Sequence, residues 1–279
     1  MNLKPPIKTL LNIPSFQQSK IKILGIPYDS NQTFSTGSRF APSYIRLASD
    51  SIEEFSIIFR KDVRDCNVSD WGDIEVSYGN YRETERHVID TLREINAEKL
   101  ILIGGDHSIS IFSVNFFSKK IRKYVQLDAH GDFDDSYLNS KYTHSSTLRR
   151  IGEILGWENI VLLGLRSISR KTLEDLEKLG VKYYTSADIE RDPSILTKEM
   201  KDADYISLDM DFFDIAYAPE VGNPEPLGLS PQIFINNIRE INPRYFDIVE
   251  ARPKSAESTT AILAATILRE VIIKMDEEF

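Results

Sequence analysis

Short apolar runs alternate with amphipathic stretches along almost the whole chain. The runs have the length of strands, and the stretches between them repeat apolar residues at helical spacing. Strands that are apolar on both faces are typical of a parallel sheet covered by helices on both sides. The pattern therefore predicts an α/β protein. The predicted strands are Ile21–Ile26, a segment near Val68, Leu100–Ile103, Tyr124–Leu127, Ile160–Leu163, Val181–Tyr184, Tyr205–Leu208 and Phe246–Val249.

No repeat, low-complexity tract or long linker divides the 279 residues. We therefore expect a single domain, 1–279, in which residues 1–20 form an N-terminal extension. The first twenty residues contain no long apolar stretch, and no apolar run is long enough to span a bilayer. A cytoplasmic protein is the expectation. The predicted helices are Pro42–Glu54, Glu83–Asn96, Ile109–Phe117, Thr147–Leu155, Arg170–Leu179, Pro193–Lys201, Pro231–Glu240 and Thr259–Lys274.

The chain is acidic, with 34 Lys and Arg against 43 Asp and Glu, and a formal net charge of −9. This field disfavours binding to nucleic acid or to anionic membranes, and leaves metal ions and small cationic substrates as ligands. The single cysteine, Cys66, excludes an internal disulfide framework and a cysteine-based zinc cluster.

Three predicted strands end in unusual polar clusters. Gly104–Ser108 contains His107, Asp128–Asp132 contains three potential metal ligands at alternate positions, and Ser207–Asp211 contains two carboxylates. Alternate side chains of an extended segment share a face. Ligands of a parallel sheet bind beyond the carboxyl ends of its strands, so these three clusters are expected to meet.

The candidate ligands in these clusters are four carboxylates and two imidazoles. The four negative charges match two divalent cations, and an oxygen-rich set without thiolates suits two Mn²⁺ better than structural zinc. Bridging carboxylates could hold the two ions roughly 3.5–4 Å apart. The candidate ligands are His107, Asp128, His130, Asp132, Asp209 and Asp211.

The sequence resembles the ureohydrolases, the family of arginase, agmatinase and formimidoylglutamase, over nearly its whole length. The resemblance implies a three-layer α/β/α sandwich with an eight-stranded, mainly parallel sheet. It also implies that His107, Asp128, Asp132 and Asp209 bind one manganese, and that Asp128, His130, Asp209 and Asp211 bind the other. The segments that carry it are Gly25–Asp29, Gly37–Pro42, Asp70–Asp73, Gly104–Ser108, Asp128–Asp132, Ser207–Asp214 and Phe246–Glu250.

A hydroxide that bridges two divalent cations can attack a guanidinium carbon. The expected reaction is hydrolysis of a guanidino C–N bond to urea and an amine. By resemblance, Asp132 relays the proton, His144 is the proton shuttle and Glu250 pairs with the substrate guanidinium. Ser145 and residues 251–258 depart from the usual family pattern, which predicts an altered pocket wall.

Agmatine is the predicted substrate. Arginases typically place an Asn where this chain has Asp134, and that Asn helps to hold the α-carboxylate of arginine. The acidic pair Asp134 and Asp135 would repel a carboxylate and attract the terminal ammonium of agmatine. Arginine, guanidinobutyrate, guanidinopropionate and formimidoylglutamate remain alternative substrates.

Two other classes of protein stay open. One is a deacetylase-like amide hydrolase with a single zinc, and the other is a catalytically weak relative that serves in binding or assembly. The complete set of six ligands argues against both. The family resemblance also implies a homotrimer or homohexamer.

Overall fold

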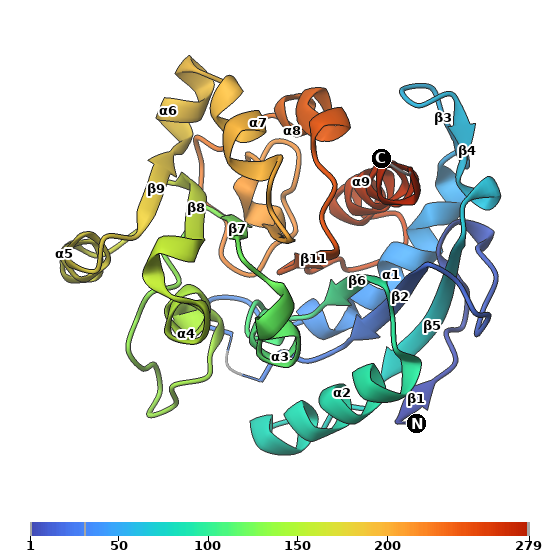
Figure 1. Ribbon diagram of the computed structural model, residues 1–279, viewed down its shortest axis with the longest axis horizontal. Helices are drawn as coiled ribbons and strands as arrows, with labels where there is room; N and C mark the ends of the chain where they lie inside the picture. Colours follow the sequence, from blue (N-terminus) through green and yellow to red (C-terminus); the bar gives the residue numbers. More distant parts are fainter. Residues whose placement is uncertain (1, 31, 278–279) are drawn as a thin grey trace.

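The computed structural model describes residues 2–30 and 32–277. A nine-stranded sheet forms its centre, in which neighbouring strands are parallel except for β1, which is antiparallel to β5 (Figure 1). The predicted α/β sandwich class is therefore confirmed. In sheet order the strands are β1 (Leu3–Lys4), β5 (Val68–Ile74), β2 (Ile21–Ile26), β6 (Lys99–Gly104), β11 (Tyr245–Val249), β10 (Tyr205–Asp209), β7 (Tyr124–Leu127), β8 (Ile160–Leu165) and β9 (Lys182–Thr185).

The predicted strand count of eight is corrected to nine in this sheet. All eight predicted strands form its parallel part, and the ninth is β1, where Leu3 pairs with Ile74 and Lys4 pairs with Asp73. Two residues are too few to show an alternation of apolar and polar side chains. A separate two-stranded hairpin is formed by β3 (Phe55–Ser56) and β4 (Lys61–Asp62). Its strands are also too short to be predicted from the sequence.

Helices cover both faces of the sheet. Alternate residues of each strand point to opposite sides, so a strand of apolar residues gives both faces an apolar surface to bury. Ile101 and Ile103 of β6 belong to one apolar core, and Leu100 and Leu102 belong to the other. In Figure 1, α7, α8 and α9 lie above the sheet, whereas α2, α3 and α4 lie below it. The helices are α1 (Ala41–Ala48), α2 (Tyr81–Ile95), α3 (Ile109–Phe117), α4 (Thr147–Leu155), α5 (Arg170–Lys178), α6 (Ser186–Arg191), α7 (Ser194–Met200), α8 (Pro231–Asn237) and α9 (Thr259–Asp276).

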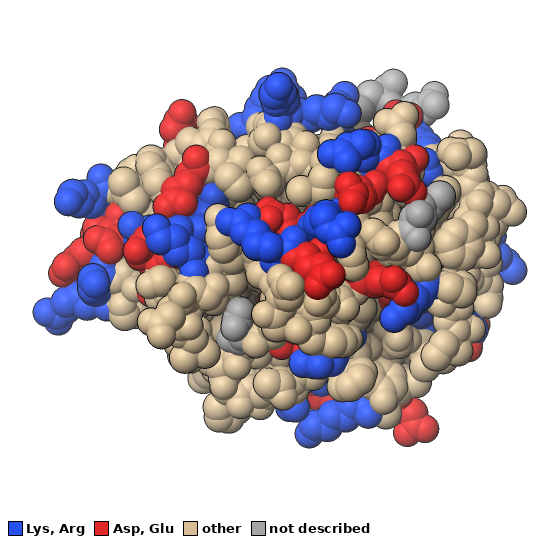
Figure 2. Space-filling view, turned by 90° about the horizontal axis from the view of Figure 1, so that it is seen from below, with Lys and Arg blue, Asp and Glu red and all other residues tan. Residues whose placement is uncertain are grey.

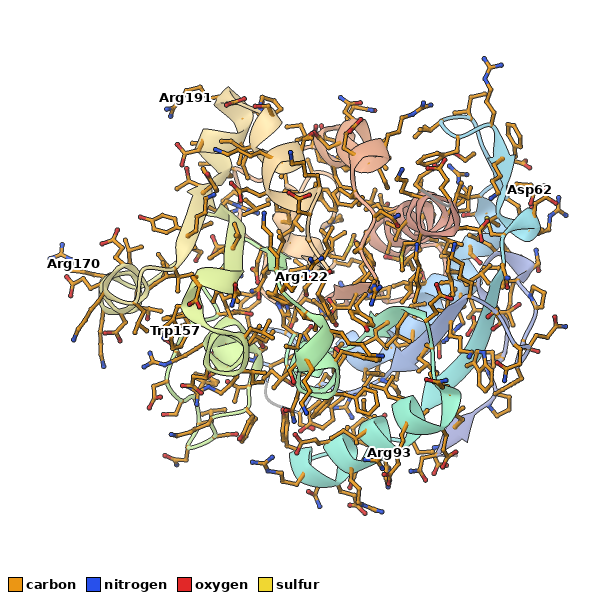
Figure 3. All side chains as sticks on the ribbon, viewed as in Figure 1. Asp62, Arg93, Arg122, Trp157, Arg170 and Arg191 are labelled. Atoms are coloured by element: carbon orange, nitrogen blue, oxygen red, sulfur yellow. The ribbon has the colours of Figure 1, made fainter. Side chains whose placement is uncertain are left out.

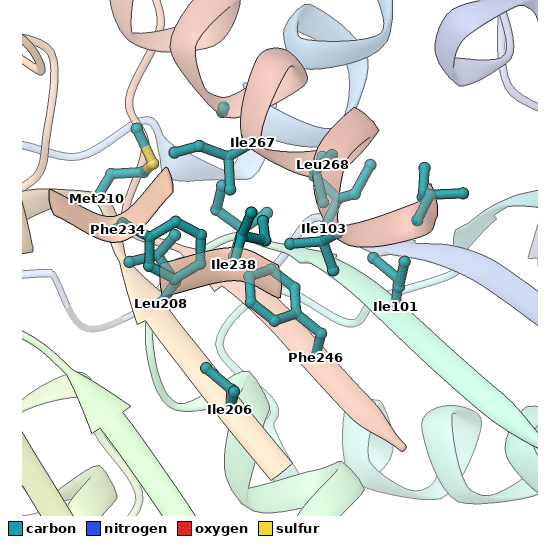
Figure 4. Packing of buried hydrophobic residues seen from close by; sticks show 14 of the residues in the cluster. Ile101, Ile103, Ile206, Leu208, Met210, Phe234, Ile238, Phe246, Ile267 and Leu268 are labelled. Atoms are coloured by element: carbon teal, nitrogen blue, oxygen red, sulfur yellow. The ribbon is translucent and has the colours of Figure 1, made fainter. Parts of the chain in front are cut away.

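The apolar core on the side of the sheet that α9 covers joins the central strands to this C-terminal helix. Ile103, Leu208 and Phe246 come from three neighbouring strands and belong to the same cluster as Ile267 and Leu268 of α9 (Figure 4). Helix α9 buries residues on several sides, which explains why apolar residues are not confined to one stripe of its sequence. This packing holds the centre of the sheet, where β6, β11, β10 and β7 are neighbours.

Arg46 ties helix α1 to strand β5 in the interior. The buried guanidinium donates to Asp70 at 2.8 and 3.0 Å, to Asp73 at 2.6 Å and to the carbonyl of Gly72 at 3.1 Å. We expect Arg46→Met to lower the free energy of unfolding by about 3–5 kcal/mol, because it leaves buried carboxylates without their partner. Chemical denaturation measures this loss.

Arg93→Met on α2 is the matched control, because this guanidinium is exposed and forms only a surface ion pair with Asp90. Its expected change is within about 0.5 kcal/mol. A loss below about 1 kcal/mol for Arg46→Met would contradict the structural role assigned to the buried ion pair.

Charged side chains of both signs lie on the outer surface. Arg93, Arg170 and Arg191 project from the outer sides of their helices (Figure 3). Seen from below, Lys and Arg lie next to Asp and Glu in several groups, and uncharged surface lies between the groups (Figure 2). Within the described part of the chain, no helix combines the length and the apolar character needed to cross a membrane.

Candidate metal centre

His107 lies among three buried carboxylates just beyond β6. Its Nδ1 atom is 3.1 Å from Oδ2 of Asp128, 3.1 Å from Oδ2 of Asp132 and 3.2 Å from Oδ2 of Asp209. The imidazole is fully buried, and within residues 2–30 and 32–277 its Nδ1 has no hydrogen-bond partner. Buried polar atoms without a partner are rare, so this convergence of oxygens on one nitrogen fits a bound cation.

A second group of ligands adjoins the first. Nδ1 of His130 is 2.8 Å from Oδ2 of Asp211 and 3.7 Å from Oδ1 of Asp128. Ligand atoms of these three residues lie within 4.8 Å of one another, as do those of His107, Asp128 and Asp209. Asp128 belongs to both groups. One shared carboxylate is the arrangement that a two-metal site requires.

Backbone N–H groups orient the carboxylates. Oδ1 of Asp128 accepts from the N–H of His130 at 2.6 Å, Oδ1 of Asp209 from the N–H of Asp211 at 2.9 Å, and Oδ1 of Asp211 from the N–H of Ala129 at 3.0 Å. In each case the other oxygen, Oδ2, lies beside an imidazole nitrogen. The loops after β7 and β10 therefore present one oxygen of each carboxylate to the centre of the site.

Neighbouring strands fix the ring of His107 from behind. Its Nε2 lies 2.9 Å from Oγ of Ser207, which donates to Oδ1 of the buried Asp247 at 2.5 Å. Oδ2 of Asp247 accepts from Ser110 and Tyr205 at 2.7 and 2.6 Å. Outer contacts of this kind select the tautomer of a metal-ligating histidine. A proton on Nε2 of His107 leaves the Nδ1 lone pair facing the three carboxylates.

Among protein groups alone, protons must balance the charge of this cluster. Burial, followed by repulsion from Asp128, raises the pKa of Asp132 to about 7. Burial raises the pKa of Asp209 as well, and repulsion from the carboxylates of Asp211 and Asp128 raises it further. Burial alone would lower the pKa of His130, but Asp211 and Asp128 outweigh it and raise this pKa to about 12. These shifts share one cause, because a dense group of buried carboxylates favours positive charge, whether it is supplied by protons or by a cation.

Binding of Mn²⁺ should release protons, because a ligating His130 must be neutral and a ligating Asp132 must be ionised. With pKa values of about 12 and about 7, His130 is protonated and Asp132 is about half protonated at neutral pH, and a bound cation would displace these protons. We expect release of at least about one proton per chain, and a manganese affinity that rises from acidic to alkaline pH. Calorimetric titration in two buffers of different ionisation enthalpy counts the protons. Binding without proton release would contradict this electrostatic description.

Four of the six candidate ligands line a cavity of about 320 Å³, namely His130, Asp132, Asp209 and Asp211. Among the described residues that line it, none is Lys or Arg. A cavity whose charged lining groups are carboxylates favours a cationic ligand. The acidic lining residues are Asp132, Asp134, Asp209, Asp211 and Glu250.

His144 lines the same cavity. Its Nε2 lies 3.4 Å from Oγ1 of Thr33, and its ring meets Tyr137 edge to face at 5.9 Å. Burial and the nearby His107 lower the pKa of His144 to about 4. The imidazole is therefore neutral at physiological pH and able to accept a proton before it donates one.

Glu250 directly follows β11 and lines the same cavity. Its Oε1 accepts from the N–H of His107 at 2.8 Å, and its Oε2 accepts from Nε2 of Gln32 at 2.7 Å. Burial, followed by Asp106, raises the pKa of Glu250 to about 8. Both Glu250, with φ +61°, and Asp132, with φ +45°, have left-handed backbone conformations. Such strain in non-glycine residues tends to concentrate at functional sites.

Asp134 and Asp135, the two acidic residues predicted to attract the ammonium group of the substrate, have different surroundings. Asp134 lines the cavity, where its Oδ1 accepts from the hydroxyl of Thr172 at 2.9 Å. Asp135 instead lies 3.3 Å from Nη2 of Arg150. Asp135 lies outside the cavity lining, so the predicted attraction of an ammonium group depends on Asp134.

The two departures from the family pattern differ in their position. Ser145 lines the cavity, and its carbonyl accepts from the N–H of Asp134 at 3.0 Å. Residues 251–258 contribute nothing to the cavity lining. They lie behind the wall instead, where Ala251 forms a bridge with Val221, the neighbour of the lining residue Gly222.

Residues 19–274 match the model of the arginase family. The chain belongs to this family. It is 31% identical over 258 residues to the agmatinase of Pyrococcus horikoshii, covering 90% of each chain. It is 30% identical over 261 residues to the N(1)-aminopropylagmatine ureohydrolase of Thermococcus kodakarensis, covering 90% and 89% of the two chains. The crystal structure of the agmatine ureohydrolase of Thermoplasma volcanium has a TM-score of 0.85 and 32% identity, covering 96% of this chain and 94% of that one.

Several residues around this arginase-family site were not predicted from the sequence. Ser207 and Asp247 are polar residues inside otherwise apolar strands, and this interruption is the signal that could have found them. Gln32 and Asn223 reach the cavity from loops far apart in the sequence. No local pattern marks such loop residues.

Proposed function

We propose that this arginase-family protein is a binuclear manganese hydrolase that converts agmatine and water into putrescine and urea. The observation that carries the proposal is the convergence of two ligand groups, which share Asp128, beside a cavity that three of their members, His130, Asp209 and Asp211, line directly. Relatives named agmatinase in Pyrococcus horikoshii and Bacillus cereus support the choice of reaction.

Manganese is proposed because the donors are carboxylate oxygens and imidazole nitrogens without a thiolate. Four carboxylates carry the charge that two divalent cations balance. When bound, the two ions would activate water for attack on the guanidinium carbon near neutral pH. The residues that would hold them are His107, Asp128, Asp132 and Asp209 for one ion, and Asp128, His130, Asp209 and Asp211 for the other.

The remaining side chains of the cavity have separate tasks in this proposal. The carboxylate of Glu250 accepts N–H groups of the guanidinium and orients its carbon toward the cluster. Asp132 accepts a proton from the attacking water, and His144 passes a proton to the departing amine nitrogen. The water oxygen becomes bonded to the guanidinium carbon, the C–N bond to the substrate chain breaks, and urea and the amine leave.

Agmatine is favoured over arginine because the lining residues that the structure describes include no Lys or Arg to hold an α-carboxylate. Asp134 would repel that group and attract an ammonium instead. Guanidinobutyrate and guanidinopropionate carry carboxylates as well, and are disfavoured for the same reason. The relative named N(1)-aminopropylagmatine ureohydrolase makes a longer guanidino polyamine the second candidate substrate.

Asp134→Asn should raise the KM for agmatine severalfold with little change in kcat. A partly exposed ion pair contributes about 0.2–1 kcal/mol, so a larger effect is not expected. Asp135→Asn is the matched control, since this neighbouring carboxylate faces Arg150 rather than the cavity. Steady-state kinetics of both variants provide the test. Equal KM values for wild type and Asp134→Asn would remove Asp134 from substrate recognition.

The substrate is tested by a screen of guanidino compounds with the Mn²⁺-loaded protein. Urea release is measured with agmatine, N(1)-aminopropylagmatine, arginine, guanidinobutyrate and guanidinopropionate, and formamide release with formimidoylglutamate. We expect the highest kcat/KM with agmatine. A preference of tenfold or more for arginine would overturn the substrate assignment and leave guanidino hydrolysis intact. Release of neither urea nor formamide from any compound would overturn the reaction itself.

A further inference from the structure

The outer nitrogen of His130 faces a loop formed by residues 221–228. This Nε2 atom lies 2.9 Å from Nδ2 of Asn223 and 3.5 Å from Oε1 of Glu225. The other ring nitrogen, Nδ1, is the one that faces Asp211 and Asp128. The ring thus stands between the candidate metal cluster on one side and the loop on the other.

The chemistry of the ring determines what the loop must provide. If Nδ1 of His130 binds a cation, the proton of the neutral ring is on Nε2, and this N–H needs an acceptor. The Nδ2 atom of Asn223 can only donate. The carboxylate of Glu225 can only accept when ionised. Glu225 can therefore accept the Nε2–H of the metal-ligating ring as it stands. Asn223 could accept it only if its amide group were flipped, so that Oδ1 instead of Nδ2 faced the ring.

Glu225 is held in place from two directions. Its Oε1 accepts from the hydroxyl of Ser167 at 2.8 Å. Arg166 anchors the loop backbone by donating to the carbonyls of Glu225 and Pro226, each at 3.0 Å, and to the carbonyl of Asp211 at 2.5 Å. The same guanidinium therefore links the loop to a residue of the metal cluster.

The segment after β8 that carries Arg166 and Ser167 is also joined to the segment that carries His130. The backbone N–H groups of Arg166 and Ser167 both donate to the carbonyl of Ala129 at 2.9 Å, and Ser167 forms a parallel bridge with His130. The position of Glu225 relative to the imidazole is thus fixed by backbone contacts on both sides. Its side chain is about 29% exposed, so the contact lies at the rim of the cavity.

We propose that Glu225 is a positioning residue that accepts the Nε2–H of His130 and thereby holds the ring in the form whose Nδ1 can bind a cation. Ser167 and Arg166 maintain Glu225 in this place. The inference rests on the proposed metal site, and adds a residue that acts through His130 without touching the cation. A carboxylate behind a ligating imidazole typically changes metal affinity about 10–100-fold.

The test is binding of Mn²⁺ to protein stripped with a chelator, measured by equilibrium dialysis and calorimetry. Wild type should bind two ions. Glu225→Ala should weaken one of the two sites about 10–100-fold and leave the other unchanged. Glu225→Gln should retain part of the affinity, since its amide oxygen can still accept. Glu257→Ala removes an exposed carboxylate outside the cavity lining and should bind like wild type.

Ser167→Ala provides a second route that leaves the loop backbone anchored by Arg166. It should weaken Mn²⁺ binding at the same site by a smaller factor. If Glu225→Ala fails to fold, the Mn²⁺ affinity of Ser167→Ala tests the inference. Unchanged affinity at both sites in Glu225→Ala and Ser167→Ala would overturn the inference, as would a lower melting temperature without a change in affinity. Failure of wild type to bind Mn²⁺ would instead overturn the proposed function.

Discussion

Asp128→Asn should abolish urea release and reduce the bound manganese below two ions per chain. Asp128 is the carboxylate that belongs to both ligand groups, so its loss removes one negative charge and a shared ligand from the centre of the cluster. The loss of activity should exceed the roughly 10–100-fold effects typical of residues behind a metal ligand. Metal analysis of the purified variant, together with kcat/KM for agmatine, measures both effects.

Asn is nearly the same size as Asp, so this substitution tests charge and ligation rather than packing. Asp135→Asn, in the loop that follows the same strand, is the control and should retain two ions and full activity. Two bound ions and wild-type activity in Asp128→Asn would show that the assignment of this carboxylate as a metal ligand is wrong.

His144→Ala should lower kcat by about 10²–10⁴-fold, the usual contribution of a positioned proton donor. Both manganese ions should remain, because His144 belongs to neither ligand group. The low pKa of His144, about 4, leaves the ring neutral and free to take up and pass on a proton. Steady-state kinetics and metal analysis of the same preparation separate a loss of proton transfer from a loss of metal. An unchanged kcat would exclude His144 from the reaction.

The parallel sheet could be predicted because its strands are buried on both faces and therefore read as unbroken apolar runs. Strand β1 could not be, since Leu3 and Lys4 pair with β5 through backbone groups that carry no side-chain pattern. Helix α6 was missed although Thr185 and Asp188 form a capping box, because it has only six residues. The helix predicted to end at Glu54 ends as an α-helix at Ala48, where a 3₁₀ turn takes over.

The six candidate ligands could be predicted because each follows a recognisable strand, and adjacent strand ends must meet. Their geometry agrees with that expectation, whereas their roles in binding and catalysis stay predictions until metal and activity are measured. Gln32, Asn223 and Glu225 could not be found in this way. They reach the site from loops whose paths depend on tertiary contacts, such as those of Arg166 with backbone carbonyls.

The most direct measurement is a titration of chelator-stripped protein with Mn²⁺ while urea release from agmatine is followed. The account predicts no urea without metal, and activity that rises with occupancy and reaches its maximum at two ions per chain. Full activity at one ion per chain would contradict the binuclear site. Two bound ions without release of urea from agmatine would contradict the proposed hydrolysis.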